Sequence, residues 1–370
     1  MSKYELETSG GGWRHGAATT LRLCGFLRAL EFKTAMEVRF ANQYRCAILY
    51  YHRIGTGGVP VYNGIPTQVF EAQINYLRKH YRVISLRQFT QEVRNRVIAP
   101  PSVVITFDDG YLGTYTEALP ILRKYDIPAT VYLTVGCIET GDIAWYDKLF
   151  LAFELREGDR FEFEFEGHKR SLPLGSRKTR LNSALKLIRE LRTVSNKRRV
   201  AFSTEFGKKF PLPNSAMTGR MLNWEQVRHM QKNGVSFGGH TMTHPPVSRL
   251  ATDELKYELA ESKEIAEKEL GAPILDFAFP FGNMDSCSQA SVDFLAATGY
   301  ETAATTMEGI NSFASDLFLL HRTSVIEDGG VSLPMCRLER LFASGASGPL
   351  ALPPRELVGS ESEFAETRRA

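Results

Sequence analysis

Short apolar runs alternate with segments of helical periodicity along much of the chain. Glycine, proline or polar residues bound each apolar run, as they do for buried strands. Strands are predicted at 46–51, 81–86, 103–107, 129–134, 234–239 and 299–304, and helices at 67–77, 86–93, 115–124, 223–232 and 252–270. Thr67 is the predicted N-cap of the first helix. This alternation is typical of a parallel α/β fold.

The alternation stops near Gly141 and resumes at Leu222. Between these positions, residues 161–165 alternate strictly between Phe and Glu, and Glu-Gly follows as a turn. Residues 181–191 then show helical spacing. The segment 141–222 is therefore predicted to be an insertion made of a β-hairpin and a helix.

The two ends of the chain lack this periodicity. We interpret 1–44 as an N-terminal extension, 45–330 as the α/β unit carrying the insertion 141–222, and 331–370 as a disordered or peripheral tail. No apolar run approaches the roughly 20 residues that a membrane-spanning helix needs. Charged residues also interrupt the apolar stretch 21–30, so no signal peptide is predicted. We therefore expect a location in the cytoplasm or at the inner membrane face.

Charge is balanced over the whole chain but not within the insertion. The 370 residues carry 45 Lys and Arg against 42 Asp and Glu, which gives no indication of a nucleic-acid partner. Residues 167–222, however, contain 14 Lys or Arg and two acids. Solvated helix faces are the ordinary interpretation. The alternative is a basic patch that contacts an anionic substrate, a phosphate-bearing lipid carrier or an acidic membrane surface.

The five cysteines are scattered and include no CxxC pair. An odd number without regular spacing argues against a disulfide framework, and a reducing compartment is the simplest interpretation.

Two stretches at predicted strand ends carry candidate chemistry. Asp108 and Asp109 follow the strand 103–107, and His240 and His244 follow the strand 234–239. Alone, an Asp-Asp-Gly turn or an HxxxH pair is a weak signal, because turns favour Asp and Gly. Together, one carboxylate and two imidazoles form a set that suits zinc and other divalent transition metals. Residues that follow parallel barrel strands converge on one rim, so these two stretches can meet there.

The same stretches resemble a known family. TFDDGY at 106–111 and HTMTH at 240–244 resemble the first two motifs of the polysaccharide deacetylases, the family-four carbohydrate esterases with a NodB-like domain. The segments leading into them, at 48–53 and 222–224, are similar too. The resemblance covers about 45–330 apart from the insertion. It implies an α/β fold built as a distorted, incomplete (β/α)7-type barrel with an inserted β-hairpin and helix.

The resemblance also implies roles for individual residues. Asp108 would be the base that activates a water held by the metal, and Asp109, His240 and His244 would be the metal ligands. The cofactor would be one divalent ion, zinc before cobalt or nickel. The substrate would be an N-acetylated amino sugar in a poly-, oligo- or lipid-linked saccharide.

A third motif, FAFPFG, departs from the family pattern. Pro280 and Phe281 fit, and the backbone N–H of Phe281 would stabilise the oxyanion, but Ala278 replaces an arginine that usually pairs with the base. The pKa of Asp108 would then depend on other neighbours, with Arg322 among them. One branch of the family has a similar run. We therefore interpret the replacement as a change in how the pKa of Asp108 is set, in an enzyme that is still active.

The identity of the general acid is the least determined role. His321 matches the histidine of the closing motif, which protonates the leaving amine in the family. In another branch of the family, a proline stands at the position of His321 and an arginine follows it. By that comparison Arg322 would be the recurrent residue, and the histidine at 321 would be a chance substitution. His52, at the end of the first predicted strand, is one alternative donor, and the water held by the metal is another. Asn311 and Tyr111 also fall near the implied site.

Two other functions remain open at this point. The change at Ala278 allows a degenerate barrel that binds glycan without hydrolysing it. Related barrels share the histidine and aspartate pattern, so a deformylase or a hydrolase of a cyclic imide is a further alternative. The sequence contains no GxSxG, HExxH, Walker-type or GxGxxG pattern. It does not indicate an oligomeric state.

Overall fold

A curled parallel sheet forms the centre of the molecule. The computed structural model describes residues 44–55, 64–325, 332–345, 350 and 352. The sheet has eight strands in the order β10-β1-β3-β4-β7-β8-β9, with β2 paired to β3, and all its strand pairings are parallel. The strands are β1 (Cys46–Tyr51), β2 (Arg82–Val83), β3 (Ser102–Phe107), β4 (Ala129–Leu133), β7 (Val235–Gly239), β8 (Asp276–Ala278), β9 (Thr302–Ala304) and β10 (Thr323–Ser324).

The two ends of the sheet approach one another. Leu320, just before β10, forms a parallel bridge with Ala304 of β9, while β10 itself pairs with β1. The sheet therefore curls into an incomplete barrel, as predicted from the sequence.

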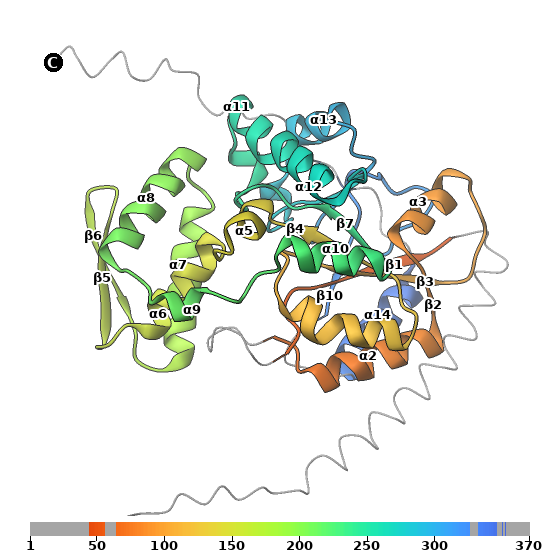
Figure 1. Ribbon diagram of the computed structural model, residues 1–370, viewed down its shortest axis with the longest axis horizontal. Helices are drawn as coiled ribbons and strands as arrows, with labels where there is room; N and C mark the ends of the chain where they lie inside the picture. The colour runs from red at the N-terminus through yellow and green to blue at the C-terminus, as the bar shows by residue number, and fades with distance from the viewer. Residues whose placement is uncertain (1–43, 56–63, 326–331, 346–349, 351, 353–370) are drawn as a thin grey trace, which may run out of the picture.

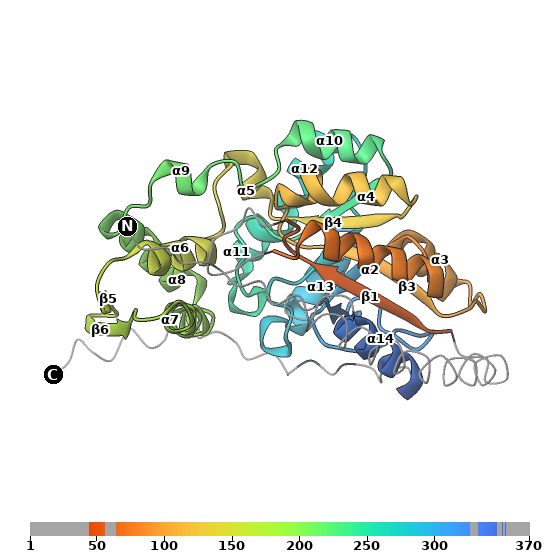
Figure 2. The same cartoon turned by 90° about the horizontal axis from the view of Figure 1, so that it is seen from below.

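Helices surround this sheet (Figure 1, Figure 2). They are α2 (Thr67–His80), α3 (Leu86–Arg94), the π-helix η1 (Thr114–Ala118) continuing into α4 (Leu119–Lys124), α5 (Val135–Thr140), α10 (Trp224–Lys232), α11 (Thr252–Leu255), the π-helix η3 (Lys256–Glu261), α12 (Ser262–Leu270), α13 (Gln289–Ala297) and α14 (Ser332–Ser344), with short 3-10 turns η2 (Val247–Arg249) and η4 (Met284–Ser286). A capping box between Asn223 and Gln226 starts α10, and Gly271 with a φ of 60° ends α12.

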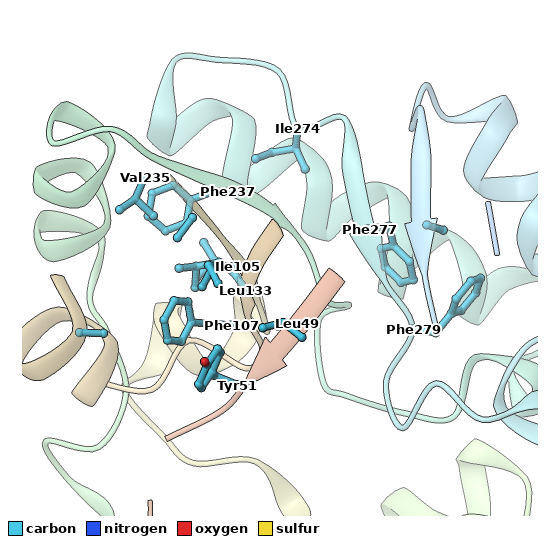
Figure 3. Packing of buried hydrophobic residues seen from close by; sticks show 14 of the residues in the cluster. Leu49, Tyr51, Ile105, Phe107, Leu133, Val235, Phe237, Ile274, Phe277 and Phe279 are labelled. Carbon is cyan, nitrogen blue, oxygen red and sulfur yellow. The ribbon is translucent and has the colours of Figure 1, made fainter. Parts of the chain in front are cut away.

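Alternate strand residues point to opposite faces of the sheet. The outward face packs against helices in the main core (Figure 3), with Leu49, Tyr51, Ile105, Phe107, Leu133, Phe237 and Phe277 among its buried side chains. The inward face contributes Ile48, Val104, Tyr132, Ala278, Ala304 and Leu320 to a separate buried cluster. The same alternation places positions 106, 108, 238, 240 and 322 on the inner face of the sheet. Side chains next to the strand ends therefore lie at the open end of the barrel.

The insertion 141–222 has its own core beside the barrel (Figure 1). It consists of α6 (Trp145–Leu155), β5 (Arg160–Phe165), β6 (His168–Pro173), α7 (Arg177–Leu191), α8 (Asn196–Lys209) and α9 (Asn214–Met217). The predicted hairpin and helix are present as antiparallel β5 and β6 and as α7. The helices α6, α8 and α9 were not predicted.

Three local predictions differ from the structure. The N-cap of α2 is Pro66, and the Thr67 hydroxyl instead donates to Glu117 at 2.7 Å. The strand predicted at 81–86 is shortened to β2, because the Ser85 side chain caps α3.

The third difference lies in 331–370, predicted as a disordered or peripheral tail. Helix α14 forms there, and its residues Met335, Leu338 and Phe342 belong to the main core. The predicted extension 1–44 lies outside the described residues apart from Tyr44, which is buried. Within the described chain, no helix is long and apolar enough to cross a membrane.

Candidate active site

The two adjacent carboxylates leave β3 in different directions. Asp108 follows the inward series of β3, and its N–H donates to the carbonyl of Tyr51 at 2.9 Å. Asp109 has a φ of 74° and Gly110 a φ of 85°, so the chain turns sharply at this point. Asp108 and Asp109 are each 2% exposed. Two neighbours in sequence thereby occupy two separate environments.

Asp109 lies between the two histidines of the HTMTH segment. Its Oδ1 is 3.4 Å from Nε2 of His240 and 3.3 Å from Nε2 of His244, and all three side chains are buried. Oδ1 of Asp109 and Nδ1 of His244 are buried and have no hydrogen-bond partner among the described residues. Nδ1 of His240 donates to the carbonyl of Ala278 at 2.7 Å, which directs its Nε2 toward Asp109. This cluster has the donor atoms that a divalent metal ion requires.

The protonation states of the cluster also suit a metal. Burial raises the pKa of the Asp109 carboxyl, but its contacts with the two imidazoles hold that pKa well below its usual range. Burial lowers the pKa of His244 and favours its neutral form. A carboxylate and neutral imidazoles are the forms that bind metal ions.

Backbone strain is concentrated at this site. Asp109, Thr241, His244 and Phe281 are four of the seven non-glycine residues in the described chain that have positive φ. This left-handed region is unfavourable for residues with a Cβ. Such conformations cluster at active sites, where the surrounding structure maintains them.

Asp108 pairs with Arg322 on the inner face of the barrel. The two guanidinium nitrogens donate to the two carboxylate oxygens at 2.7 and 2.8 Å, and the Arg322 side chain is wholly buried. Its Nε donates to the carbonyl of Thr305 at 2.7 Å, and its guanidinium lies over the ring of Tyr50. Burial raises the pKa of Asp108, but the charge of Arg322 more than offsets this and leaves the pKa below its usual value. Asp108 is thus an ionised carboxylate that is not part of the metal cluster.

Arg322 reaches Asp108 from a different part of the sheet than an arginine at position 278 would. Ala278, on β8, is fully buried on the inner face. Arg322 enters the same interior from the segment that precedes β10. The sequence named Arg322 among the possible neighbours of Asp108, but it did not predict the bidentate contact.

Phe281 has a backbone conformation suited to an oxyanion donor. Phe281 and Gly282 have φ values of 62° and 60°, and the Thr306 hydroxyl donates to the Phe281 carbonyl at 2.6 Å. A Cβ on Gly282 would lie 2.6 Å from the backbone nitrogen of Thr306, so this turn requires glycine. Within the described chain, the N–H of Phe281 has no hydrogen-bond partner. Buried Pro280 precedes it, and the Phe281 ring lies 4.8 Å from that of His244.

A cavity of about 280 Å³ opens over these groups. Its volume lies at the lower end of the range typical of small-ligand sites. The barrel contributes Tyr50, His52, Asp108, Asp109, Tyr111, His240, His244, Phe281 and Thr306 to the lining, and the insertion contributes Tyr146, Asp147, Phe150, Leu185, Ile188, Arg189 and Arg192. No motif or spacing in the sequence connects individual residues of the insertion to the barrel, although the basic composition of 167–222 suggested contact with an anionic substrate as one alternative.

A buried polar network joins the insertion to the barrel. Asp147 of α6 accepts from Arg53 and from the hydroxyl of Tyr111, and that hydroxyl lies 3.1 Å from the hydroxyl of Tyr146. Nε1 of Trp145 donates to the carbonyl of His244 at 3.0 Å. The start of α6 is therefore fixed against the cluster of Asp109, His240 and His244.

The structure separates the two candidate general acids. His52 lines the cavity. His321 is 5% exposed and is not among the lining residues; it stands next to Arg322 in the chain and so faces the other side of the sheet. The side chain of Asn311 forms two hydrogen bonds with the backbone of His321, at 2.9 and 3.0 Å. Asn311 therefore stabilises the chain around His321 and does not line the cavity.

A barrel with an Asp-His-His cluster and a separate ionised carboxylate at its strand ends has the groups that a metal-assisted hydrolase uses. Residues 96–303, more than half of the chain, match the family model described as Polysaccharide deacetylase. The chain belongs to this family, whose members are hydrolases that act on carbon–nitrogen bonds other than peptide bonds.

Individual relatives agree with this assignment. The chain is 21% identical to "Putative polysaccharide deacetylase YxkH" of Bacillus subtilis over 80% of this chain and 76% of the relative. It is 25% identical to "Poly-beta-1,6-N-acetyl-D-glucosamine N-deacetylase" of Staphylococcus epidermidis over 47% of this chain and 60% of that enzyme.

Solved structures share the fold at low identity. The deacetylase PplD of Streptococcus pyogenes, in complex with acetate, is similar with a TM-score of 0.55 and 20% identity over 81% of this chain and 99% of its own. IcaB of Ammonifex degensii has a TM-score of 0.52 and 19% identity over 79% of this chain and 96% of its own.

Proposed function

We propose that this protein is a metal-dependent N-deacetylase of N-acetylated amino sugars in a poly-, oligo- or lipid-linked saccharide. The observation that carries the proposal is the division of the carboxylate pair: Asp109 lies with His240 and His244, whereas Asp108 is held separately by Arg322. The name of the Staphylococcus epidermidis relative supports an N-acetylated sugar, and the acetate bound to the Streptococcus pyogenes neighbour corresponds to the expected product.

Asp109, His240 and His244 would hold the metal, and zinc fits this donor set best, with cobalt or nickel as alternatives. When bound, such an ion supplies Lewis-acid activation of water and of the amide carbonyl. The unpartnered Oδ1 of Asp109 supports this assignment, because a buried carboxylate oxygen without a hydrogen bond is costly unless a cation compensates it.

The remaining steps use the side chains around the cavity. Asp108 accepts the proton of the water that attacks the acetamide carbon, and its pairing with Arg322 keeps it ionised for this task. The N–H of Phe281 donates to the oxyanion as it forms. We assign protonation of the leaving amine to His52 because it lines the cavity and His321 does not. The carbon–nitrogen bond then breaks and releases acetate and the free amino sugar.

The direct test is release of acetate and of new amines from N-acetylglucosamine oligomers by the purified protein. We expect turnover with zinc or cobalt, loss of turnover after chelation, and recovery when zinc is restored. His244→Ala should lower the bound zinc as well as the activity. Glycan binding without acetate release would support the degenerate barrel instead, and release of formate in place of acetate from N-formylated sugars would support a deformylase.

A further inference from the structure

One face of α7 forms a wall of the cavity. Leu185, Ile188, Arg189 and Arg192 line it, and their spacing of three, four and seven residues places them on one side of a helix. Arg192 directly follows the last residue of α7 and retains helical backbone angles. The wall therefore combines two apolar side chains with two guanidinium groups.

Each carboxylate of the cavity already has its own partner. Asp108 pairs with Arg322, Asp147 pairs with Arg53, and Asp109 belongs to the metal-binding cluster. These acidic groups are therefore not available as counter-ions for the α7 wall.

The two arginines of the wall have no carboxylate partner. Among the residues that the structure describes, neither Arg189 nor Arg192 forms an ion pair. Arg192 donates to the side-chain oxygen of Asn283 at 2.7 Å and lies 4.1 Å from the ring centre of Phe281. Burial lowers the pKa of Arg192, Asp285 partly offsets this, and the charge of Arg189 lowers it further.

A helix C-terminus attracts cations, and this alone explains a basic residue at Arg192. It does not explain why both guanidinium groups line the cavity without pairing with any of its carboxylates. Two neighbouring guanidinium groups next to apolar surface provide a ready binding site for an oxyanion, because each offers several N–H donors in a planar fork.

We propose that Arg189 and Arg192 form an anion subsite that binds a phosphodiester or carboxylate group of the saccharide beside the sugar being deacetylated. This proposal rests on the proposed function. Arg192 covers the ring of Phe281, whose N–H is the assigned oxyanion donor, so the subsite adjoins the reacting position. The substrate class is accordingly an anionic N-acetylated saccharide. Its charge comes either from a phosphodiester, as in a lipid-linked or phosphate-linked glycan, or from a uronic acid.

Three trisaccharides of N-acetylglucosamine distinguish these sources. One is neutral, one carries a methyl phosphodiester at its reducing end, and one has a glucuronate as its reducing sugar. We expect kcat/KM to be about 10-fold to 100-fold higher for at least one anionic substrate than for the neutral one, the range for loss of a charge-assisted hydrogen bond. The preference should lie mainly in KM, because the anion binds away from the reacting carbonyl. It should also decrease as salt is raised.

Arg189→Gln should remove most of this preference, and Arg189→Lys should keep part of it. Lys186→Gln is the matched control, because Lys186 is an exposed basic residue of the same helix that does not line the cavity. Its preference for the anionic substrate should equal that of the wild type.

The outcomes separate the two proposals. Acetate release at equal kcat/KM from all three trisaccharides, or an unchanged preference in Arg189→Gln, overturns the anion subsite and leaves the deacetylase intact. No acetate from any of them overturns the proposed function itself. A preference for one anionic substrate identifies the source of the charge.

Discussion

The barrel and the insertion contribute to one cavity in different ways. The barrel provides Asp108, Asp109, the imidazoles and the turn at Phe281, all of which follow strand ends. The insertion provides aromatic, apolar and basic walls from α6 and α7, and the Asp147 carboxylate that pairs with Arg53. The order of the strands therefore places the groups proposed to react. The insertion, which lies outside the main core of the barrel, determines the shape and charge of the cavity around them.

The two regions are also stabilised separately. Their hydrophobic cores are distinct clusters, and the barrel core contains the outward faces of its strands. Near the cavity they are joined by the Asp147 network with Arg53 and Tyr111 and by the hydrogen bond from Trp145 to His244. The rings of Trp145 and Tyr146 also pack against that of Phe281. Substitutions in the barrel should therefore affect the reaction itself, and substitutions in the insertion should affect substrate choice or the support of the site.

The largest effect should come from the barrel. Asp108→Asn removes the proposed base without touching the metal ligands, so kcat should fall by about 10²- to 10⁴-fold. Zinc content, measured on the same preparation, should stay at the wild-type level. Asp109→Asn is the matched variant and should lose both zinc and activity. If both variants lost zinc equally, the division of roles between the two carboxylates would be wrong.

The second-largest effect should come from replacing Arg322, the partner of the proposed base Asp108. Arg322→Met leaves Asp108 buried without its cation, which should reduce the free energy of unfolding by about 3–5 kcal/mol. Without the arginine, burial raises the pKa of Asp108, so the acid limb of the kcat/KM profile should move to higher pH. Pairing lowers this pKa in the wild type, so the stability it contributes is present above the usual carboxyl range and is lost as the pH falls below that range.

Arg322→Lys is the control for this variant, because it keeps the charge and loses the bidentate geometry. Its acid limb should lie between those of the wild type and Arg322→Met. An acid limb that stays at the wild-type pH in folded Arg322→Met would show that the metal alone sets the ionisation of Asp108.

The smallest effect tests whether the insertion supports the metal cluster. Trp145→Phe keeps most of the ring packing and removes the hydrogen bond to the carbonyl of His244, which is worth about 1 kcal/mol. Zinc affinity, measured by competition with a chelator, should fall a few-fold, and kcat at saturating zinc should change little. If Trp145→Phe lowered kcat as much as Asp108→Asn, the insertion would take part in the reaction itself. The assignment of the reaction to the barrel and of support to the insertion would then be wrong.

Local patterns predicted several strands and helices of the parallel α/β fold well, and the resemblance to a known family predicted the incomplete barrel. Runs such as 46–51 and 129–134 have strand periodicity, and the structure places β1 and β4 there within one residue. The carboxylate pair and the HTMTH segment could be related because parallel strands direct their ends to one rim. The sequence could not predict the ion pair between Asp147 and Arg53. That contact between the insertion and the barrel depends on tertiary packing, which local periodicity does not reveal.

The same limit applies to Arg322. Its pairing with Asp108 requires β10 to lie beside β1, which in turn pairs with β3. This order of the strands does not follow from the order of the residues along the chain. Likewise, the four residues with positive φ at the site have no common composition that would reveal them, since Asp, Thr, His and Phe all occur in ordinary loops.

The origin of Arg322 has a consequence for the order in which the site is completed. During synthesis, Asp108, Asp109 and both histidines leave the ribosome well before residue 322. Arg322 is followed at once by β10, the last described strand, which pairs with β1, the first described strand. Asp108, the proposed base, therefore gains its cation only when β10 pairs with β1, and a chain cut before this point would keep the proposed metal ligands but leave Asp108 without Arg322.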